Sequence, residues 1–351
     1  MPDRRHWILG LGAATVAAGL GLYAVRRRQR AAAEAASAQP PPPPPARPEG
    51  VPLSPFDVNS TADQVTQGID LTGRTVLVTG VTSGVGFETM RVLAARGAHV
   101  LGTGRALDRA RKACESVQGR TTPLALELTD YRSVIVCAAA VRALGVPLDA
   151  LICNAGVMAL PKLEQVEGVE RQFATNHLGH FLLVRRLRDL VEAAPQGRVV
   201  VVSSSAMDWA HPDGIEWDNL SGERDYDPNR NYGQSKLANA LFSLELARRF
   251  EGTNATSNAL HPGYVDTELF RHYPLSLRGF NNVLASGKIS VAQGAATSCY
   301  VATAPALARV SGHFFRECNP VVPDPRARDA TAATRLWDVS EQLLKPYLAG
   351  T

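Results

Sequence analysis

From Leu71 onward, short runs of β-branched and aliphatic residues alternate with longer stretches that have the spacing of amphipathic helices. This alternation is typical of a parallel sheet covered by helices on both faces. The predicted strands are Thr75–Thr79, His99–Thr103, Leu124–Leu128, Ala150–Cys153, Val199–Ser203, Thr256–Leu260 and Gly312–Phe315. The predicted helices are Gly84–Arg96, Leu107–Val117, Arg132–Leu144, Val169–Val191, Tyr232–Phe250, Val291–Thr303 and Ala327–Leu344. The pattern therefore predicts one α/β domain with a doubly wound parallel sheet of about seven strands.

The start of the chain follows a different pattern. From Trp7 to Val25 no residue is charged, and a helix of that length, at about 1.5 Å per residue, can cross the hydrocarbon core of a bilayer. Two arginines precede the stretch, at positions 4 and 5, and four follow it, at 26, 27, 28 and 30. Because positive charge marks the cytoplasmic side, we expect residues 1–30 to form a single-pass membrane anchor with the rest of the chain facing the cytoplasm.

A second interpretation of the same residues is export. The run Arg4-Arg5-His6-Trp7-Ile8-Leu9 is similar to a twin-arginine signal, and Ala36-Ser37-Ala38 could be its cleavage site. The arginines directly after the apolar stretch count against this alternative. Residues 31–68 are predicted to be an Ala/Pro-rich linker, in which Pro40 to Pro45 form a polyproline spacer. The folded domain is then expected over residues 69–351.

Charge and cysteine content exclude several function classes. The 351 residues carry a net charge of +4, from 37 Lys and Arg against 33 Asp and Glu. Residues 1–50 alone hold seven arginines against three acidic residues, 7 − 3 = +4, so the rest of the chain is neutral. No basic face for nucleic acid is predicted. The five cysteines contain no C-x-x-C pair, so neither a metal site nor a disulfide framework is expected.

A glycine-rich loop directly follows the first predicted strand and opens a helix. Its sequence is Thr79-Gly80-Val81-Thr82-Ser83-Gly84-Val85-Gly86. Glycines let the chain turn tightly and bring backbone N–H groups close to a pyrophosphate, while the helix N-terminus adds partial positive charge. We therefore expect a dinucleotide to bind here, with its phosphates at Gly80, Ser83, Gly84, Val85 and Gly86.

A tyrosine and a lysine four residues apart, Tyr232 and Lys236, lie on one face of a predicted helix. A phenol, with a free pKa near 10, exchanges its proton at neutral pH only if a nearby cation stabilises the phenolate. The pair alone is weak evidence, but it follows a predicted strand that ends in Ser203-Ser204-Ser205. The arrangement indicates acid–base chemistry at this strand end.

Together these motifs resemble the short-chain dehydrogenase/reductase family, and the resemblance covers residues 71–267. It implies a Rossmann-type fold and four catalytic residues. Tyr232 would be the acid/base, Lys236 would lower the pKa of Tyr232, and Ser204 would hold the substrate oxygen, with Ser203 and Ser205 as alternatives. Asn176 would carry a water that relays protons from the lysine.

The resemblance also implies how a nicotinamide cofactor is held. The N-A-G element after the fourth strand and the P-G-x-V-x-T element after the sixth would line the cofactor, and their residues are Asn154, Ala155, Gly156, Pro262, Gly263, Val265 and Thr267. Arg105 stands where an NAD enzyme carries an acidic residue, which favours NADP(H) over NAD(H). Glu127 stands near the position of the family's adenine-binding aspartate.

Finer similarity points to the retinol-dehydrogenase-like branch, which includes the dehydrogenase part of the WW-domain-containing oxidoreductase. It is carried by the N-H-L-G-H-F run at 176–181 and the S-K-L-A-N run at 235–239; no WW domain is found in this sequence. The branch implies interconversion of a carbonyl and an alcohol on a lipophilic small molecule, such as a retinoid, steroid or fatty aldehyde. Apolar residues in Met207–Arg230 and Leu269–Ile289 would form a lid over it.

Two further expectations follow from the resemblance. Helices Val169–Val191 and Tyr232–Phe250 are those the family commonly uses for a dimer interface, so a homodimer is considered. The alternative to an enzyme is a membrane-tethered scaffold or regulatory protein that binds NADP(H) with little turnover. The complete set of four catalytic residues counts against a pure scaffold.

Overall fold

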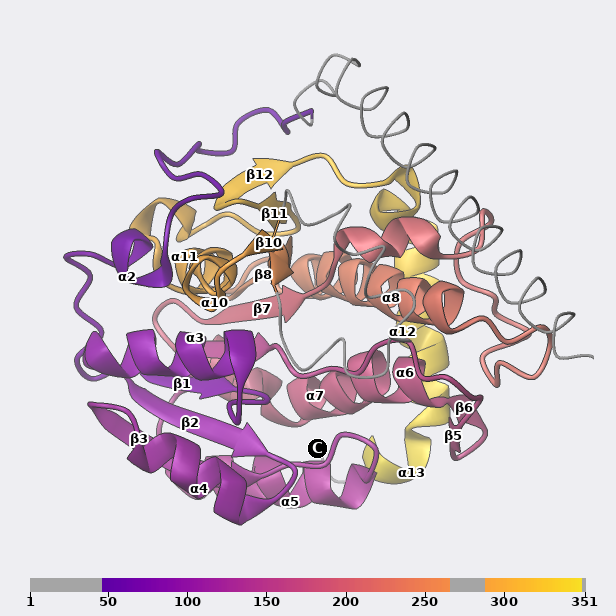
Figure 1. Cartoon of the computed structure of the whole chain (residues 1–351), viewed down its shortest axis with the longest axis horizontal. Helices are drawn as coiled ribbons and strands as arrows, with labels where there is room; N and C mark the ends of the chain where they lie inside the picture. The colour runs from indigo at the N-terminus through magenta and orange to yellow at the C-terminus, as the bar shows by residue number, and fades with distance from the viewer. Residues whose placement is uncertain (1–45, 266–287, 349–351) are drawn as a thin grey trace, which may run out of the picture. The chain divides into compact units, whose positions relative to one another are not determined.

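The computed structural model describes residues 46–265 and 288–348. Its main element is an eight-stranded sheet in the order β12-β11-β8-β7-β4-β1-β2-β3, with helices on both faces (Figure 1). The strands are β1 Thr75–Val78, β2 His99–Gly104, β3 Arg120–Ala125, β4 Ala150–Cys153, β7 Arg198–Val202, β8 Thr256–His261, β11 Phe314–Arg316 and β12 Asn319–Val321. Neighbouring strands are parallel except β11 and β12. The predicted doubly wound, Rossmann-type sheet is confirmed.

Helices cover the sheet in two layers. One face carries α2 Ala62–Val65, α3 Gly84–Ala95, α4 Leu107–Glu115, α10 Val291–Gly294 and α11 Ala296–Thr303. The other carries α5 Tyr131–Arg142, α7 Gly179–Glu192 and α8 Pro228–Arg249, with α6 Arg171–Phe173, α12 Ala330–Leu343 and α13 Lys345–Leu348 beside them. Successive strand residues point to opposite faces, so Leu77 belongs to one buried cluster and Val76 and Val78 to the other.

Several boundaries differ from the prediction. Strand β3 begins four residues before the predicted Leu124–Leu128, because its register with β2 runs from His99 opposite Arg120 to Gly104 opposite Ala125. It is an edge strand, which does not need an apolar sequence. The sequence did not predict strand β12, because this strand has only three residues and runs antiparallel to β11 after a tight turn. That turn has positive φ angles at Glu317 and Cys318, which is a conformation rare outside glycine.

The predicted helix Val169–Val191 is interrupted in the structure. Its first two residues pair as strand β6, Val169–Glu170, with β5, Gln165–Val166. A short α6 then passes into a π-helical turn, Ala174–Leu178, before α7 begins. Such widened turns occur frequently at functional sites, and this one carries Asn176.

The folded unit begins at Ala46, earlier than the predicted boundary at residue 69. The backbone oxygen of Ala46 accepts a hydrogen bond from the Val322 amide. The Asn319 side chain accepts from the Ser54 amide and donates to the Phe56 oxygen, at 3.0 and 2.7 Å. These contacts form with residues more than 250 positions away, which local composition does not reveal. The predicted anchor at Trp7–Val25 lies outside the described residues, and within 46–265 and 288–348 no helix could span a membrane.

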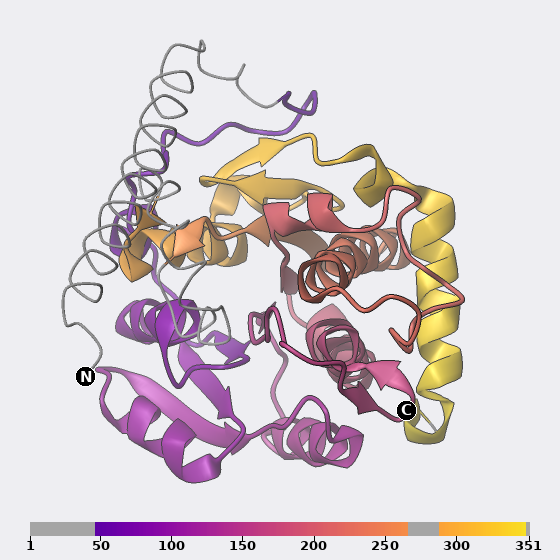
Figure 2. The same cartoon turned by 45° about the vertical axis from the view of Figure 1, so that its right-hand side comes forward.

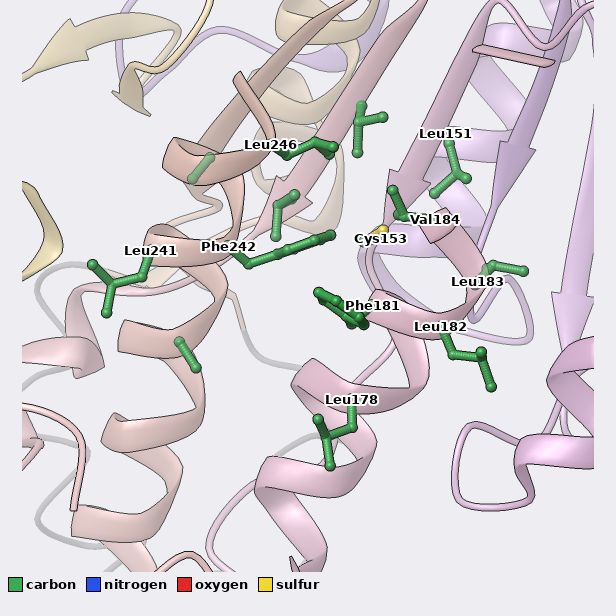
Figure 3. Close-up of a cluster of buried hydrophobic side chains, with 14 of the residues drawn as sticks. Leu151, Cys153, Leu178, Phe181, Leu182, Leu183, Val184, Leu241, Phe242 and Leu246 are labelled. Atoms are coloured by element: carbon green, nitrogen blue, oxygen red, sulfur yellow. The ribbon is translucent and has the colours of Figure 1, made fainter. Parts of the chain in front are cut away.

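Helices α7 and α8 meet over a buried aromatic cluster, in which Phe181 and Phe242 face each other (Figure 3). Their ring centroids are 5.5 Å apart. Trp337 of α12 packs against both, at 4.9 and 6.0 Å, and α12 is further joined to this layer by a 2.8 Å bond between the His177 ring and the Ser340 hydroxyl. Figure 2 shows α12 as the long yellow helix beside this layer. Helix α12 therefore covers the part of α7 and α8 against which Trp337 packs. These are the helices that were expected to form the interface of a homodimer.

Candidate active site

A cleft opens at the carboxyl ends of the parallel strands, where ligands bind in open α/β sheets. It is lined by residues that follow β1, β2, β4, β7 and β8 and by the first turns of α3 and α8. The predicted site residues that line it are Gly80, Ser83, Gly84, Val85, Gly86, Arg105, Glu127, Asn154, Ala155, Gly156, Ser204, Tyr232, Lys236, Pro262, Gly263 and Val265. Asn176 does not line the cleft, and Thr267 lies outside the described residues.

The glycine-rich loop forms one end of the cleft. Gly80 has a φ of +76°, and a Cβ there would lie 2.9 Å from the Cβ of Ala155. A Cβ on Gly86 would lie 2.3 Å from the Gly80 oxygen and 2.4 Å from Nδ2 of Asn154. Ser83, the N-cap residue of α3, makes no side-chain capping bond. The first amides of α3 are therefore left for an anion, and this end fits the pyrophosphate of a dinucleotide.

Thr79 holds the loop to β4 and was not identified from the sequence. Its Oγ1 accepts hydrogen bonds from the amides of Asn154 and Ala155, both at 2.9 Å. It also lies 2.9 Å from Nε2 of His180, whose Nδ1 is 3.0 Å from the backbone oxygen of Asn176. That carbonyl can only accept, so Nδ1 donates and Nε2 accepts from Thr79. Burial lowers the pKa of His180 to about 4, which keeps the ring neutral.

Two arginines line the cleft beyond the end of β2. Arg105 was predicted from the sequence, and Arg109 lies four residues later, in α4. Arg105 precedes α4, which begins at Leu107, so no helical spacing joins the two arginines and no sequence signal identified Arg109. Glu127 also lines the cleft, but its Oε1 accepts from the amide and hydroxyl of Thr129, at 3.0 and 2.8 Å. One carboxylate oxygen of Glu127 is therefore used to stabilise its own loop.

Tyr232 and Lys236 lie in the first turns of α8, which Asp227 caps by accepting from the amides of Asn229 and Arg230. Both Tyr232 and Lys236 are 4% exposed. The Lys236 Nζ atom lies 5.6 Å from the centroid of the Tyr232 ring and donates to the Val202 oxygen at 3.1 Å. Burial lowers the pKa of Lys236 to about 8, so a single charged ammonium lies beside the phenol at neutral pH.

The three serines after β7 have different surroundings. The Ser203 hydroxyl is buried and donates to the Lys236 backbone oxygen at 2.6 Å. The Ser205 hydroxyl lies 3.2 Å from the Tyr264 hydroxyl, and its amide donates to Nδ1 of the buried His261. Ser204 lines the cleft together with Ser203, and its Oγ accepts from the Ala206 amide at 3.1 Å, a bond that does not use the hydroxyl hydrogen. Of the three, Ser204 has the hydroxyl best placed to bind a group in the cleft.

Asn176 is completely buried in the π-helical turn. Its Oδ1 accepts from the Val157 amide at 2.8 Å, and its Nδ2 donates to the Val157 oxygen and to the Ser235 hydroxyl, both at 2.9 Å. The side chain thus joins the segment after β4 to helix α8 between Tyr232 and Lys236. Its backbone oxygen is the atom bonded to His180.

Further residues of the cleft were not named as site residues from the sequence, although Trp209 lies in the predicted lid segment Met207–Arg230. Arg171 and Thr175 line it from the region before α7. Trp209 and Tyr264 line it from the loops after β7 and β8, and they are 43% and 44% exposed. Met207, at the start of the predicted lid, is buried instead. Of the second predicted lid segment, Leu269–Ile289, all but the last two residues lie outside the described residues.

Comparisons with known proteins agree with this geometry. Residues 74–216 match the short chain dehydrogenase family. The chain is 41% identical to short-chain dehydrogenase TIC 32 A, chloroplastic, from Brassica napus, over 82% of this chain and 93% of that protein. It is 37% identical to human retinol dehydrogenase 14 over 78% and 86% of the two chains, and 37% identical to the human WW domain-containing oxidoreductase over 84% and 73%.

A solved structure extends the comparison. An uncharacterized protein from Mycobacterium paratuberculosis has a TM-score of 0.65 and 34% sequence identity, over 80% of this chain and 97% of that one. Both the sequence matches and the shared architecture extend well beyond the glycine-rich loop. The chain therefore belongs to the short-chain dehydrogenase family, in its retinol-dehydrogenase-like branch.

Proposed function

We propose that this protein is an NADP(H)-dependent oxidoreductase that interconverts a carbonyl and an alcohol on a lipophilic small molecule. The observation that carries the proposal is a single cleft that holds the glycine-rich loop at one end and Ser204, Tyr232 and Lys236 at the other. Relatives named as retinol dehydrogenase and as oxidoreductase support the same class of reaction.

Tyr232 is the proposed proton donor and acceptor. When bound, the cofactor supplies or accepts a hydride at its nicotinamide ring. Ser204 donates its hydroxyl hydrogen to the substrate oxygen and so places that oxygen beside the phenol. Lys236, 5.6 Å from the ring, favours the phenolate by its charge, so the proton moves between the Tyr232 oxygen and the substrate oxygen near neutral pH.

Asn176 contributes to the proposed reaction in two ways, through the contacts of its side chain and through its backbone oxygen. Its side chain fixes Val157 and Ser235 around the catalytic turn of α8. A water bound to its backbone oxygen would relay protons from Lys236, as expected for this family. The bond from His180 to the same oxygen fixes its direction.

The preference for NADP(H) is supported by Arg105 and Arg109, which line the cleft beside the end of β2. A 2′-phosphate carries two negative charges, and guanidinium groups bind phosphate with charge-assisted hydrogen bonds. No aspartate or glutamate stands between Gly102 and Leu107 to accept from a ribose 2′-hydroxyl.

A lipophilic substrate is supported by the other end of the cleft. Met158, Ala159, Ala206 and Tyr232 form a small apolar cluster there. Trp209 adds an exposed aromatic ring whose centroid lies 6.4 Å from that of Tyr232. Apolar walls with few polar groups are typical of sites that take apolar ligands.

For location, the proposal is a single-pass anchor in residues 1–30 that holds the enzyme at a membrane with the catalytic domain in the cytoplasm. The support is the uncharged stretch Trp7–Val25 and the excess of arginines after it. Twin-arginine export is the alternative. Labelling of a cysteine introduced into residues 31–45 with a membrane-impermeant maleimide, in intact and lysed cells, distinguishes the two.

The proposal is tested by following NADPH and NADH oxidation by the full-length chain with retinal, decanal and a steroid ketone. Tyr232→Phe is the matched control, because it removes one oxygen and keeps the ring. We expect turnover with NADPH that falls about 10²- to 10⁴-fold in Tyr232→Phe, while NADPH binding is retained. If NADPH binds but no carbonyl is reduced, the scaffold alternative is favoured instead.

A further inference from the structure

We propose that Trp209 forms a wall of the substrate site and that Arg326, which lies outside the cleft, is the positioning residue that fixes this wall. The inference rests on the proposed function, because it concerns the substrate end of the same cleft. It gives the C-terminal part of the chain a role in substrate selection. Neither residue belongs to the motifs that carry the family resemblance.

Trp209 is well placed to contact a substrate. It ends the short 3₁₀ helix Ser205–Trp209, which begins directly after Ser204. Its ring lies beside that of Tyr232, it lines the cleft, and 43% of its surface is exposed. An indole that remains this exposed next to a buried phenol offers a large apolar surface to a ligand.

Arg326 holds the backbone at the end of this turn. Its Nη1 atom donates to the oxygens of Ala210 and His211, at 3.1 and 2.7 Å. The Asp324 carboxylate accepts hydrogen bonds from Nε and Nη2 of Arg326, at 2.9 and 2.8 Å, and so fixes the orientation of the guanidinium group. A planar guanidinium paired through two nitrogens has little rotational freedom, so the position of Ala210 is set by a residue 116 positions away.

The opposite side of the turn rests on helix α8. A Cβ on Gly233 would lie 2.7 Å from the Ala206 oxygen, 2.7 Å from the Ala210 nitrogen and 2.9 Å from the Trp209 carbonyl carbon. The turn is therefore in direct backbone contact with the helix that carries Tyr232. It is held between Gly233 and Arg326, and loss of either contact lets Trp209 move relative to the phenol.

Arg326 does not line the cleft, so it acts on the substrate only through this turn. The glycine-rich loop and Arg105 are at the cofactor end, and among the described residues they form no hydrogen bond with residues 205–211 or 324–328. Loss of Arg326 is therefore expected to change the KM for the carbonyl substrate and to leave the affinity for NADPH unchanged.

The test compares full-length Arg326→Gln with Arg328→Gln, an exposed arginine of the same 3₁₀ turn, Pro325–Arg328. KM and kcat are measured for retinal and decanal with NADPH, and NADPH affinity by fluorescence titration. We expect KM to rise about tenfold or more in Arg326→Gln, with kcat within about twofold of the parent, and no change in Arg328→Gln.

Tryptophan fluorescence reports on the surroundings of Trp209 directly. The emission of Trp209 is obtained by subtracting the spectrum of the Trp209→Phe variant in each background, and its quenching by acrylamide is measured. We expect stronger quenching of Trp209 in Arg326→Gln than in the parent and in Arg328→Gln. This measurement needs no substrate, so it tests the positioning role even if no carbonyl is reduced and the proposed function fails.

If Arg326→Gln does not fold, as judged by loss of NADPH binding, the same KM and quenching measurements are made on Asp324→Asn. It keeps the guanidinium and the capping oxygen but removes the charge that orients Arg326, so the same changes are expected in weaker form. An unchanged KM together with unchanged Trp209 quenching, in whichever of the two variants folds, overturns the proposal.

Discussion

The two ends of the cleft are built from different kinds of contact. At the cofactor end, the Gly86 backbone lies close to the Gly80 oxygen and to the side-chain nitrogen of Asn154, which donates to the Thr79 oxygen. At the substrate end, the turn that carries Trp209 is held by Gly233 and by Arg326. Residues of recognisable sequence motifs therefore define the first end, whereas the second depends on Arg326, which belongs to no such motif. Changes at the two ends should separate cofactor binding from substrate binding.

Gly86→Ala should have the largest effect and should act on the cofactor end. The new Cβ would lie 2.3 Å from the Gly80 oxygen, so the loop must move away from its phosphate-binding position. Overpacking of this kind costs about 1–3 kcal/mol, and we expect NADPH affinity to fall about 10- to 100-fold. Calorimetric titration with NADPH measures this affinity. Gly145→Ala is the control, since nothing lies within 4 Å of its Cβ position; it carries backbone strain but no clash, and should bind NADPH normally.

Gly233→Ala should act on the other end. Its Cβ would meet the backbone of the Trp209 turn at 2.7 Å, so the turn rather than the glycine-rich loop must shift. We expect kcat/KM for retinal to fall about tenfold, while NADPH affinity stays near that of the parent. Equal losses of NADPH affinity in Gly233→Ala and Gly86→Ala would mean that the two ends are not independent.

Arg105→Gln should change the choice between cofactors. A hydrogen bond to a charged group contributes about 1.5–3 kcal/mol, but Arg105 is exposed and the phosphate is partly solvated. We expect the KM for NADPH to rise about tenfold, with little change for NADH. Steady-state kinetics with both cofactors measures the ratio of the KM for NADPH to the KM for NADH. The control is Arg111→Gln, which replaces an exposed arginine of α4 outside the cleft. An unchanged ratio would contradict the assignment of NADP(H).

The smallest effect at neutral pH concerns three buried histidines, His177, His180 and His261. Burial lowers the pKa of His180 to about 4 and those of His177 and His261 to about 3, whereas the unfolded value is near 6.5. Below pH 6.5 the unfolded chain binds more protons, so stability falls as the pH falls. Each histidine should remove about 1.4 kcal/mol per pH unit between pH 6 and 5.

Urea unfolding at several pH values measures this loss. His180→Gln should reduce the dependence of the unfolding free energy on pH by the contribution of one histidine. His211→Gln, which replaces a half-exposed histidine, is the control and should leave that dependence unchanged. A free energy of unfolding that is constant between pH 6.5 and 5 would contradict the neutral state of these rings.

The sequence predicted the sheet and the position of the glycine-rich loop between β1 and α3 well, because both depend on local signals. Apolar runs of the right length located β1, β2 and β4, and β4 matches at both ends. The glycine-rich loop and the Tyr232–Lys236 pair were found by spacing, because a tight backbone approach and an i, i+4 side-chain pair leave a fixed pattern. The folded start at Ala46 left no such pattern, because its contacts are with residues near 319–322.

Order along the chain placed three serines at one strand end, but only their surroundings distinguish them. Ser203 and Ser204 both line the cleft, and the Ser203 hydroxyl donates to the Lys236 oxygen, whereas the Ser204 hydroxyl accepts from the Ala206 amide. The Ser205 hydroxyl lies near that of Tyr264. Likewise, only packing shows that α12 covers the helices where Trp337 lies and that Arg326 supports the Trp209 turn. The amino-acid sequence by itself determined the fold class, the family and the residues of the cofactor loop, since these follow from short-range periodicity and spacing. The tertiary structure decided the hydrogen-bond partners of each serine hydroxyl and the support of the turn that carries Trp209, because those contacts join residues more than a hundred positions apart or depend on side-chain direction.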